Sequence, residues 1–371
     1  MVRRPSRRAQ IGQWVLLAGV VALGWLLADM VAENYARKNL HFGFDFLGDQ
    51  AHFDIPFHLI SWNLFDTYAR TLLISFLNTI LVATIAIVLA TVMGLFVGIM
   101  RLSPNWLARN VALSFIEFIR NTPLLVQIIF WYVGVMQTLP SPRQSIAFPG
   151  GVLLNIRGLY LPDAIARADA STLWWLALVA VAITPLVWLL RIGSERIGTK
   201  ALLLPLVGMG LFVAGIDRID YPALKGFNLT GGTQVPPELA ALALGLATYA
   251  SAFIAEIVRG SIEAIAKGQH EAAQALGLKG WQRLFLVILP QALRIMVPQM
   301  TSQYLNIIKS SSLGAAIAYP ELFSIFTGTV LNQTGKEVET IAIVAAVFVT
   351  FNLIASLLMN WYNRRVALVE H

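Results

Sequence analysis

Few side chains in this sequence have the types and spacing for bond-making chemistry. The chain has no cysteine and five histidines, of which only His41, His52 and His58 are near one another. Their spacing matches no standard metal-ligand pattern. The sequence contains no G-x-x-x-x-G-K-[ST] loop that would hold a nucleotide phosphate. The polar residues that remain are suited to binding rather than to catalysis.

A polar segment at 259–290, between two long apolar runs, is suited to docking with another protein. At its centre, alanines and Leu276 form a short helix that Gly277 is expected to end with a left-handed cap. A helix of about ten residues is marginal alone in water, so this helix needs docking partners. Its small side chains would let a protein groove approach closely, with Leu276 as an apolar anchor. The candidate docking residues in this helix are Glu271, Ala272, Ala273 and Gly277.

A second set of polar residues lies in the apolar run that follows. Gln299, Gln303 and Asn306 are spaced by four and three residues, so they share one helical face. Polar groups are costly against lipid, and this face should therefore look into the bundle or a cavity. It indicates either a substrate path or hydrogen bonds between helices. Lys309 near the outer end is either a gate or a snorkelling lysine, and Glu256 would favour a cationic substrate if it faced the path.

Composition places these residues in a membrane protein. Of 371 residues, 57% are hydrophobic and only 13% are charged, about half the charged fraction of a soluble domain. The net charge of +7 fits basic cytoplasmic loops, and the chain lacks the clusters of basic and stacking residues that mark a nucleic-acid surface. We therefore expect an all-α polytopic membrane protein in contact with lipid, with no nucleic-acid partner.

Apolar runs predict about eight transmembrane helices. They cover residues 11–28, 72–100, 111–139, 173–190, 201–216, 238–258, a run from about Pro290, and 340–361. Eight crossings put both termini in the cytoplasm, where the predicted loops also carry more basic residues. The first run follows four arginines and has some features of a signal peptide, but its length favours a retained span. Pro123 breaks helical pairing inside the third run, so neighbouring groups must satisfy the freed carbonyls.

These runs divide the chain into four parts. Residues 1–71 are an N-terminal transmembrane helix and an external segment, and residues 72–139 are two helices. Residues 140–237 hold external loops and the helix pair 173–190 and 201–216. Residues 238–371 hold the last helices and the docking segment 259–290.

The four candidate docking residues, followed at the expected distance by Leu289 and Pro290, are similar to the coupling loop of one family, the membrane subunits of ABC importers, with Val287 where the family usually has Ile. The resemblance adds Leu289 and Pro290 to the candidate docking residues. Residues 255–260 and 289–294 are similar to the polar amino-acid branch of those permeases. So is the stretch Arg120-Asn121-Thr122-Pro123-Leu124-Leu125-Val126-Gln127. The three blocks occur in the family's order, and the resemblance covers residues 72–361 apart from an insertion.

The resemblance implies a type I ABC importer core of five helices with a cytoplasmic coupling helix. It implies a permease for L-amino acids, broad in range, in the bacterial inner membrane. No cofactor is expected in this chain, because ATP would be bound by a partner. The implied partners are two ATP-binding subunits, a second and non-identical permease, and a periplasmic solute-binding protein. Since a minimal permease of this branch has about five spans, the pair 173–190 and 201–216 is interpreted as a peripheral insertion that faces lipid.

Two other functional classes are weighed against this one. An ion-gradient-driven transporter or a channel would have no ATPase partner, and should show paired carboxylates at the membrane midplane or basic gating repeats. A membrane enzyme should show a nucleophile or metal constellation at a membrane edge. The sequence shows neither pattern, and it does not indicate which amino acids are carried.

Overall fold

The computed structural model describes residues 7–37, 41–167, 172–176, 179–180, 203–226 and 228–366. The chain forms two compact units, one made of Met1–Ile87 with Ile254–His371 and the other of Val88–Phe253. Two long helices, α2 (Tyr68–Arg101) and α8 (Pro237–Glu263), pass from one unit into the other. Among the described residues, five helices are long and apolar enough to cross a membrane, and a bent pair is a sixth candidate.

Five of the predicted spans correspond to these long helices. They are α1 (Arg7–Arg37), α2, α8, α11 (Leu289–Ser310) and α13 (Glu337–Val366). The run from α10 (Gly280–Arg283) through the π-helix η5 (Leu284–Ile288) and α11 counts as one candidate span, which reaches Ile317. Pro290 lies in the first turn of α11, as the sequence predicts.

The predicted count of eight spans is not confirmed. The predicted span 173–190 falls largely outside the described residues. The predicted span 201–216 is α7 (Leu203–Ala214), a helix of 12 residues, which is shorter than the roughly 20 residues that a crossing needs. What the described part of the chain supports is a helical protein with five long apolar helices and one bent candidate.

The predicted span 111–139 is broken rather than continuous. α3 (Trp106–Asn121) is followed by α4 (Leu124–Ile129), the π-helix η2 (Phe130–Val135) and the 3-10 turn η3 (Met136–Thr138), with a bend of 106° at the break. Thr122 is extended, with φ −100° and ψ 127°, which is the conformation that a following proline favours. The Gln127 side-chain amide donates to the carbonyls of Ile119 and Thr122, both at 3.0 Å. Gln127 thus satisfies the carbonyls freed by Pro123, as expected of a neighbour.

α8 is the most deeply buried of the long helices, with 72% of its most apolar window inside the protein. Its small residues allow close packing in the second unit. A Cβ placed on Gly245 would lie 2.8 Å from Ile128 Cγ1 and 3.1 Å from Ile128 Cα, so α4 packs directly on the glycine. At the N-terminal end of α8, Tyr132 donates to Glu238 at 3.0 Å.

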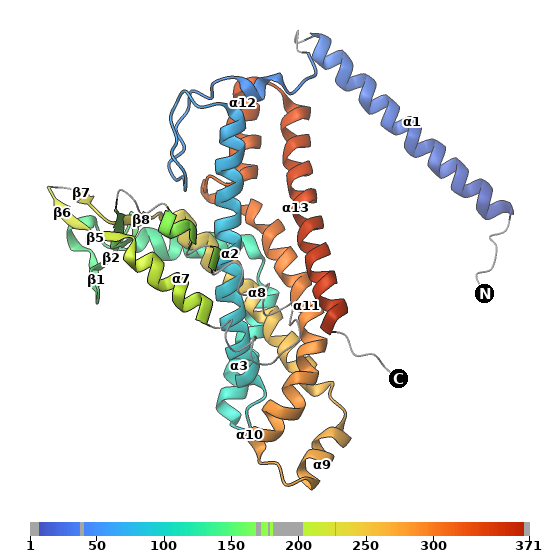
Figure 1. Ribbon diagram of the computed structural model, residues 1–371. Helices are drawn as coiled ribbons and strands as arrows, with labels where there is room; N and C mark the ends of the chain where they lie inside the picture. The colour runs from blue at the N-terminus through green and yellow to red at the C-terminus, as the bar shows by residue number, and fades with distance from the viewer. Residues whose placement is uncertain are drawn as a thin grey trace. The chain divides into compact units, whose positions relative to one another are not determined.

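The two predicted external loops of the second unit contain short strands instead of only irregular chain (Figure 1). The strands are β1 (Ile146–Phe148), β2 (Val152–Asn155), β3 (Gly158–Leu161), β4 (Asp163–Ala166), β5 (Ile216–Asp220), β6 (Ala223–Lys225), β7 (Asn228–Thr230) and β8 (Thr233–Val235). One sheet has the order β1-β2-β3-β8, and β4 pairs with β5 and β6 with β7, all antiparallel. The pairs β3–β8 and β4–β5 therefore join the chain on either side of α7.

In the first unit, the segment 41–67, which the sequence predicts to be external, packs against the helices of that unit. It contains the 3-10 turn η1 (Asp45–Gly48). Phe46 and Ala51 are buried in a cluster with the start of α2, with α13 and with the π-helix η7 (Ser324–Val330). The members of this cluster on the other elements are Tyr68, Leu322, Ile325, Phe326, Val330 and Val344.

A polar hub lies beside that cluster, between η6 (Ser311–Ile317) and η7. The Asn78 amide donates to the carbonyls of Phe57 and Pro320, both at 2.9 Å, and Tyr319 donates to the Asn78 carbonyl at 3.0 Å. The buried Glu321 carboxylate accepts from the N–H groups of Phe323 at 2.9 Å and Ser324 at 2.6 Å. Burial raises the pKa of Glu321 to about 7, although these two hydrogen bonds lower it.

α1 is joined to the rest of the first unit near its C-terminal end. Tyr35 donates to the fully buried Glu339 carboxylate at the start of α13, which also accepts from the Gly43 N–H at 3.1 Å. Lys336 lies 3.6 Å from the same carboxylate. The apolar window of α1 is 0% buried, so its length is open to lipid or to another protein.

Candidate functional site

The predicted docking helix is present as α9 (Lys267–Ala275). Gly277 has φ +73°, the left-handed conformation predicted for it. The Leu278 N–H donates to the Ala273 carbonyl at 3.1 Å and the Gly277 N–H donates to the Gln274 carbonyl at 2.9 Å, which is the hydrogen-bond pair of a Schellman cap. A Cβ on Gly277 would meet nothing within 4 Å, so conformation, not space, favours glycine here.

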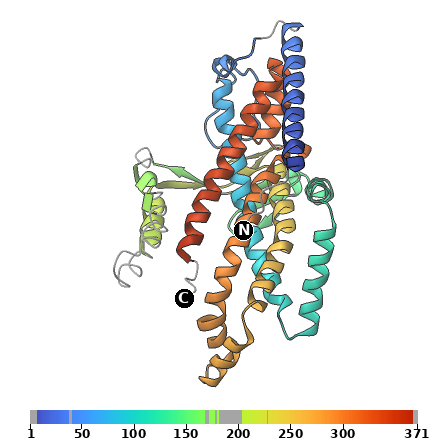
Figure 2. The same ribbon diagram turned by 90° about the vertical axis from the view of Figure 1, so that its right-hand side faces the viewer.

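α9 presents most of its surface outward. Ala273 is buried, while Glu271, Ala272 and Gly277 are exposed. Leu276 is 80% exposed. A large apolar side chain this exposed at the end of a polar helix is suited to insert into a pocket on another protein. Within the first unit, α9 and α10 lie at one end of α11, and α12 (Leu331–Thr334) lies beyond the other end (Figures 1 and 2).

α9 is held against the start of α11 by apolar and polar contacts. Ile265 just before α9 packs with Ile288 and Ala292. The Gln291 amide donates to the Gln269 side chain at 3.2 Å. The last two candidate docking residues lie in the first turn of α11, where Leu289 is half-buried and Pro290 is exposed. A force on α9 would therefore reach α11 through packed residues.

Glu256, which comes just before the docking segment in the chain, forms an ion pair with Arg259. Arg259 donates to the Glu256 carboxylate from Nε at 3.2 Å and from one terminal nitrogen at 2.8 Å, and its other terminal nitrogen contacts Glu263. All three lie at the end of α8. The negative charge of Glu256 is therefore compensated inside its own helix.

The polar face predicted on α11 is present, and its side chains are largely exposed. Gln299 and Asn306 are exposed, and Gln303 is half-buried. These side chains are not enclosed by the described part of this single chain. Because amides are costly against lipid, their surroundings in the membrane should be water or another protein.

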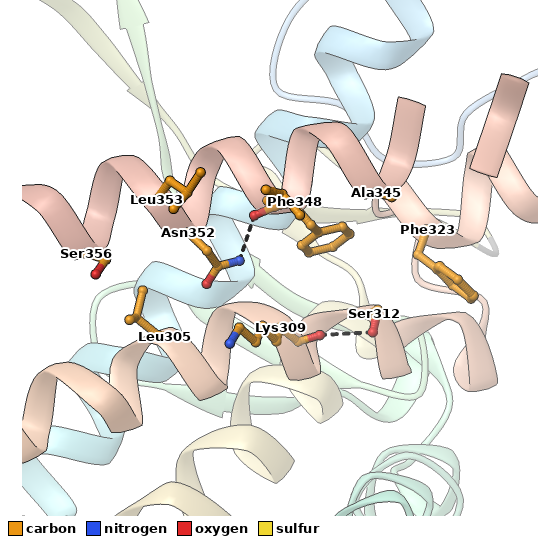
Figure 3. A pocket seen from close by; sticks show the side chains of 10 residues that line it. Leu305, Lys309, Ser312, Phe323, Ala345, Phe348, Asn352, Leu353 and Ser356 are labelled. Carbon is orange, nitrogen blue, oxygen red and sulfur yellow. Dashed lines mark hydrogen bonds between the residues drawn. The ribbon is translucent and has the colours of Figure 1, made fainter. Parts of the chain in front are cut away.

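Lys309 lies apart from those three amides, in a cavity of about 580 Å³ in the first unit. Leu305, Lys309 and Ser312 form one wall, and Phe348, Asn352 and Ser356 of α13 form the opposite wall (Figure 3). Of the five candidate path residues, the cavity includes Lys309 alone. Asn352 was not predicted as a site residue, because its only signal was that it is one of two amides, with Asn360, inside the apolar run 340–361.

Among the described residues, no group of three or more His, Cys, Asp or Glu side chains is placed to hold a metal ion. The arrangement therefore offers no metal centre there. What it offers is an exposed, capped helix connected to a long apolar helix that carries polar residues along its length.

Comparisons with known proteins agree with this architecture. A family model described as "Binding-protein-dependent transport system inner membrane component" matches residues 87–368. The chain is 46% identical to the putative amino-acid ABC transporter permease protein YhdX of Escherichia coli K12, over 99% of this chain and 96% of that protein. It is 41% identical to the general L-amino acid transport system permease protein AapQ of Rhizobium johnstonii, over 99% and 94%.

One solved structure supports the fold. A crystal structure of an amino acid ABC transporter with histidines aligns with a TM-score of 0.51 and 22% identity, over 80% of this chain and 95% of that one. At this identity the similarity concerns the arrangement of the helices.

Proposed function

We propose that this chain, which belongs to the family of binding-protein-dependent transport system inner membrane components, is the permease subunit of an ATP-driven importer of L-amino acids. The observation that carries the proposal is α9, an exposed helix of small residues with a Schellman cap, packed against the start of a long apolar helix. The similarity to YhdX and AapQ along nearly the whole chain supports an amino-acid substrate of broad range.

α9 is the proposed contact with the ATP-binding subunits. Leu276 would enter a pocket on that partner, Ala272 would allow close approach, and Glu271 would supply a charged contact. Ala273 and Gly277 keep the helix seated and capped, and Leu289 and Pro290 begin the helix that receives the movement. ATP would then be hydrolysed on the partner, and this chain would bind no cofactor and perform no hydrolysis itself.

The polar face of α11 is the proposed side of the substrate path. Gln299, Gln303 and Asn306 face out of the single chain, and a polar face in a membrane helix requires a protein or water-filled surrounding. A second permease subunit facing α11 would supply it. The pairing of Glu256 with Arg259 leaves Glu256 little net charge with which to select a cation.

The remaining features of the proposal follow from topology. α9 must lie in the cytoplasm to meet an ATPase, which places both termini there if the chain crosses the inner membrane eight times. The segment 41–67 and the strands β1 to β8 would then lie on the periplasmic side, where a solute-binding protein delivers its cargo. The insertion around α7 makes this subunit larger than a five-helix permease and favours a non-identical partner.

The test is transport by the assembled complex. The chain is co-expressed with the subunits encoded beside it, purified, and reconstituted with the solute-binding protein. We expect an ATPase to co-elute, and uptake of labelled L-amino acids that requires ATP and continues when ionophores dissipate ion gradients. Uptake that follows an ion gradient and ignores ATP would instead support the alternative class, a gradient-driven transporter or channel.

A further inference from the structure

We propose that the cavity between α11 and α13 is a subsite for the α-amino-acid end of the transported substrate. Lys309 is the counter-charge for the carboxylate, and the side-chain oxygen of Asn352 accepts a hydrogen bond from the ammonium group. This inference rests on the proposed function, and it adds the chemistry by which the permease itself would recognise its cargo.

The charge of Lys309 is the first support. Lys309 lies in a helix that belongs to the candidate span Gly280–Ile317, where a lone cation is costly and is normally paired. Within the part of the chain that the structure describes, ion pairs are formed by Arg37, Arg70, Arg259 and Lys336, and Lys309 is not among these cations. An anionic ligand in the cavity would supply the missing partner.

Asn352 is the second and independent support. Its side-chain nitrogen donates to the Phe348 carbonyl at 2.7 Å (Figure 3). Its oxygen is buried and accepts no hydrogen bond from the described residues. A buried acceptor without a donor is destabilising, and an amide oxygen is a suitable partner for an ammonium N–H. The cavity thus combines a donor cation with an unused acceptor, the pair that a zwitterion requires.

The rest of the lining explains a broad range of side chains. Leu305, Phe323 and Phe348 form apolar walls, and none of the ten lining residues is acidic. The cavity holds about 580 Å³, a volume within the range of small-molecule sites. It can therefore hold the constant end of an amino acid by charge and hydrogen bonding while its walls accept different apolar or neutral side chains.

The position of Lys309 favours substrate over a phospholipid, whose phosphate could also pair with it. Asn306 precedes Lys309 by one helical turn and continues the polar face that includes Gln303 and Gln299. The cavity itself is lined by the polar side chains of Ser312, Asn352 and Ser356 beside Lys309, and polar groups of this kind are costly in a groove that faces acyl chains. The subsite is therefore on the same helix as the proposed path, one turn beyond Asn306, although the three amides do not line it.

The test uses the assembled importer without its solute-binding protein, so that selection by that protein does not contribute. Binding of labelled L-leucine and L-glutamine is measured by scintillation proximity, with each free amino acid and its α-amide as competitors. A hydrogen bond to a charged group is worth about 1.5–3 kcal/mol, so we expect the wild type to prefer the acid over the amide by about tenfold or more.

Lys309→Gln should bind the acid and the amide nearly equally, and Lys309→Arg should keep most of the preference. Asn352→Leu, which removes the acceptor and keeps the volume, should weaken binding of both competitors without changing their ratio. Lys225→Gln, on the exposed strand β6, is the matched control and should behave as wild type. If Lys309→Gln does not assemble into the complex, the test is made with Lys309→Arg and Asn352→Leu.

Three results would overturn the subsite: no saturable binding by wild type, a wild-type acid preference in Lys309→Gln, or loss of only a co-purifying anionic phospholipid in that variant. None of these results would remove ATP-driven uptake by the wild-type complex. Failure of that uptake would instead overturn the proposed function, so the two failures are distinguishable.

Discussion

The side chain of Gln127 hydrogen-bonds the carbonyl of Ile119, eight residues earlier and on the other side of the Pro123 break, at 3.0 Å. The same amide nitrogen also reaches the Thr122 carbonyl. Since proline removes a backbone donor and ends α3, these bonds replace the pairing that a continuous helix would have had. The bend of 106° is thus stabilised by one side chain.

Gln127→Leu should lower the free energy of unfolding by about 1–3 kcal/mol, because the half-buried Thr122 carbonyl would lose this donor and the Ile119 carbonyl would keep only its longer bond from the Thr122 N–H, at 3.3 Å. The measurement is thermal unfolding of the purified protein in detergent. Gln144→Leu, at an exposed position in the 3-10 turn η4 (Pro142–Gln144), is the control and should unfold as wild type. Equal unfolding midpoints for the two variants would mean that the bend is held by other contacts.

Two glycines in α8 should respond to alanine with opposite signs. Gly245→Ala places a methyl group 2.8 Å from Ile128 Cγ1, so α4 must move, at a cost of about 1–3 kcal/mol. Gly260→Ala meets open space and should stabilise the helix by about 0.5–1 kcal/mol. The measurement is the denaturation midpoint of each variant compared with that of wild type. A higher midpoint for Gly245→Ala would show that the close packing of α4 on α8 is absent.

Gly277→Val should uncouple ATP hydrolysis from uptake while the membrane helices stay folded. A β-branched residue at φ +73° is strained by about 1–2 kcal/mol, which is enough to loosen the end of α9. Gly277→Asn is the matched variant, because asparagine tolerates this conformation, and it should stay coupled. The readout is the ratio of amino acids taken up to ATP hydrolysed. A wild-type ratio in Gly277→Val would count against α9 as the coupling element.

Stability should depend on pH through Glu321. Its pKa is raised from 4.5 to about 7 by burial, so the protonated form is favoured by folding. The contribution is complete below about pH 4.5 and is lost as pH rises to about 7, a change of roughly 3 kcal/mol. The neighbouring Tyr319, whose pKa is also raised by burial and by the Glu321 charge, stays protonated throughout this window.

Glu321→Gln should therefore unfold at a temperature that changes less between pH 4.5 and 8 than that of wild type. Asp54→Asn, at an exposed position in the segment 41–67, is the control and should keep the wild-type slope. A wild-type slope in Glu321→Gln would mean that other groups cause the pH dependence.

Local signals predicted the backbone structure of the segment 259–290 well, because each signal acts within a few residues. Gly277 adopts its predicted left-handed cap and Pro290 starts α11, since backbone conformation at both positions is restricted by residue type alone. The long apolar helices were also predictable, because membrane thickness fixes their length. The roles of the candidate residues in coupling and transport stay predictions.

Features that depend on distant partners could not be predicted. Strands of three to five residues, such as β4 and β5, are too short to show a two-residue period, and their pairing is set across about fifty residues of chain. Pro123 predicted a break, but the angle depends on where Gln127 finds its acceptors. Asn352 was visible as an amide in an apolar run, but only the packing of α13 against α11 shows that it lines a cavity with Lys309.

The antiparallel pairing of Ala166 with Ile216 has a consequence for the chain between them. Ala166 ends β4 and Ile216 begins β5, on either side of the segment that contains α7, so the two ends of that segment are held next to each other. Chain between two fixed neighbouring points can lengthen, shorten or diverge with little entropic cost to the rest. The segment that contains α7 can therefore change in length at little entropic cost while β4 and β5 remain paired.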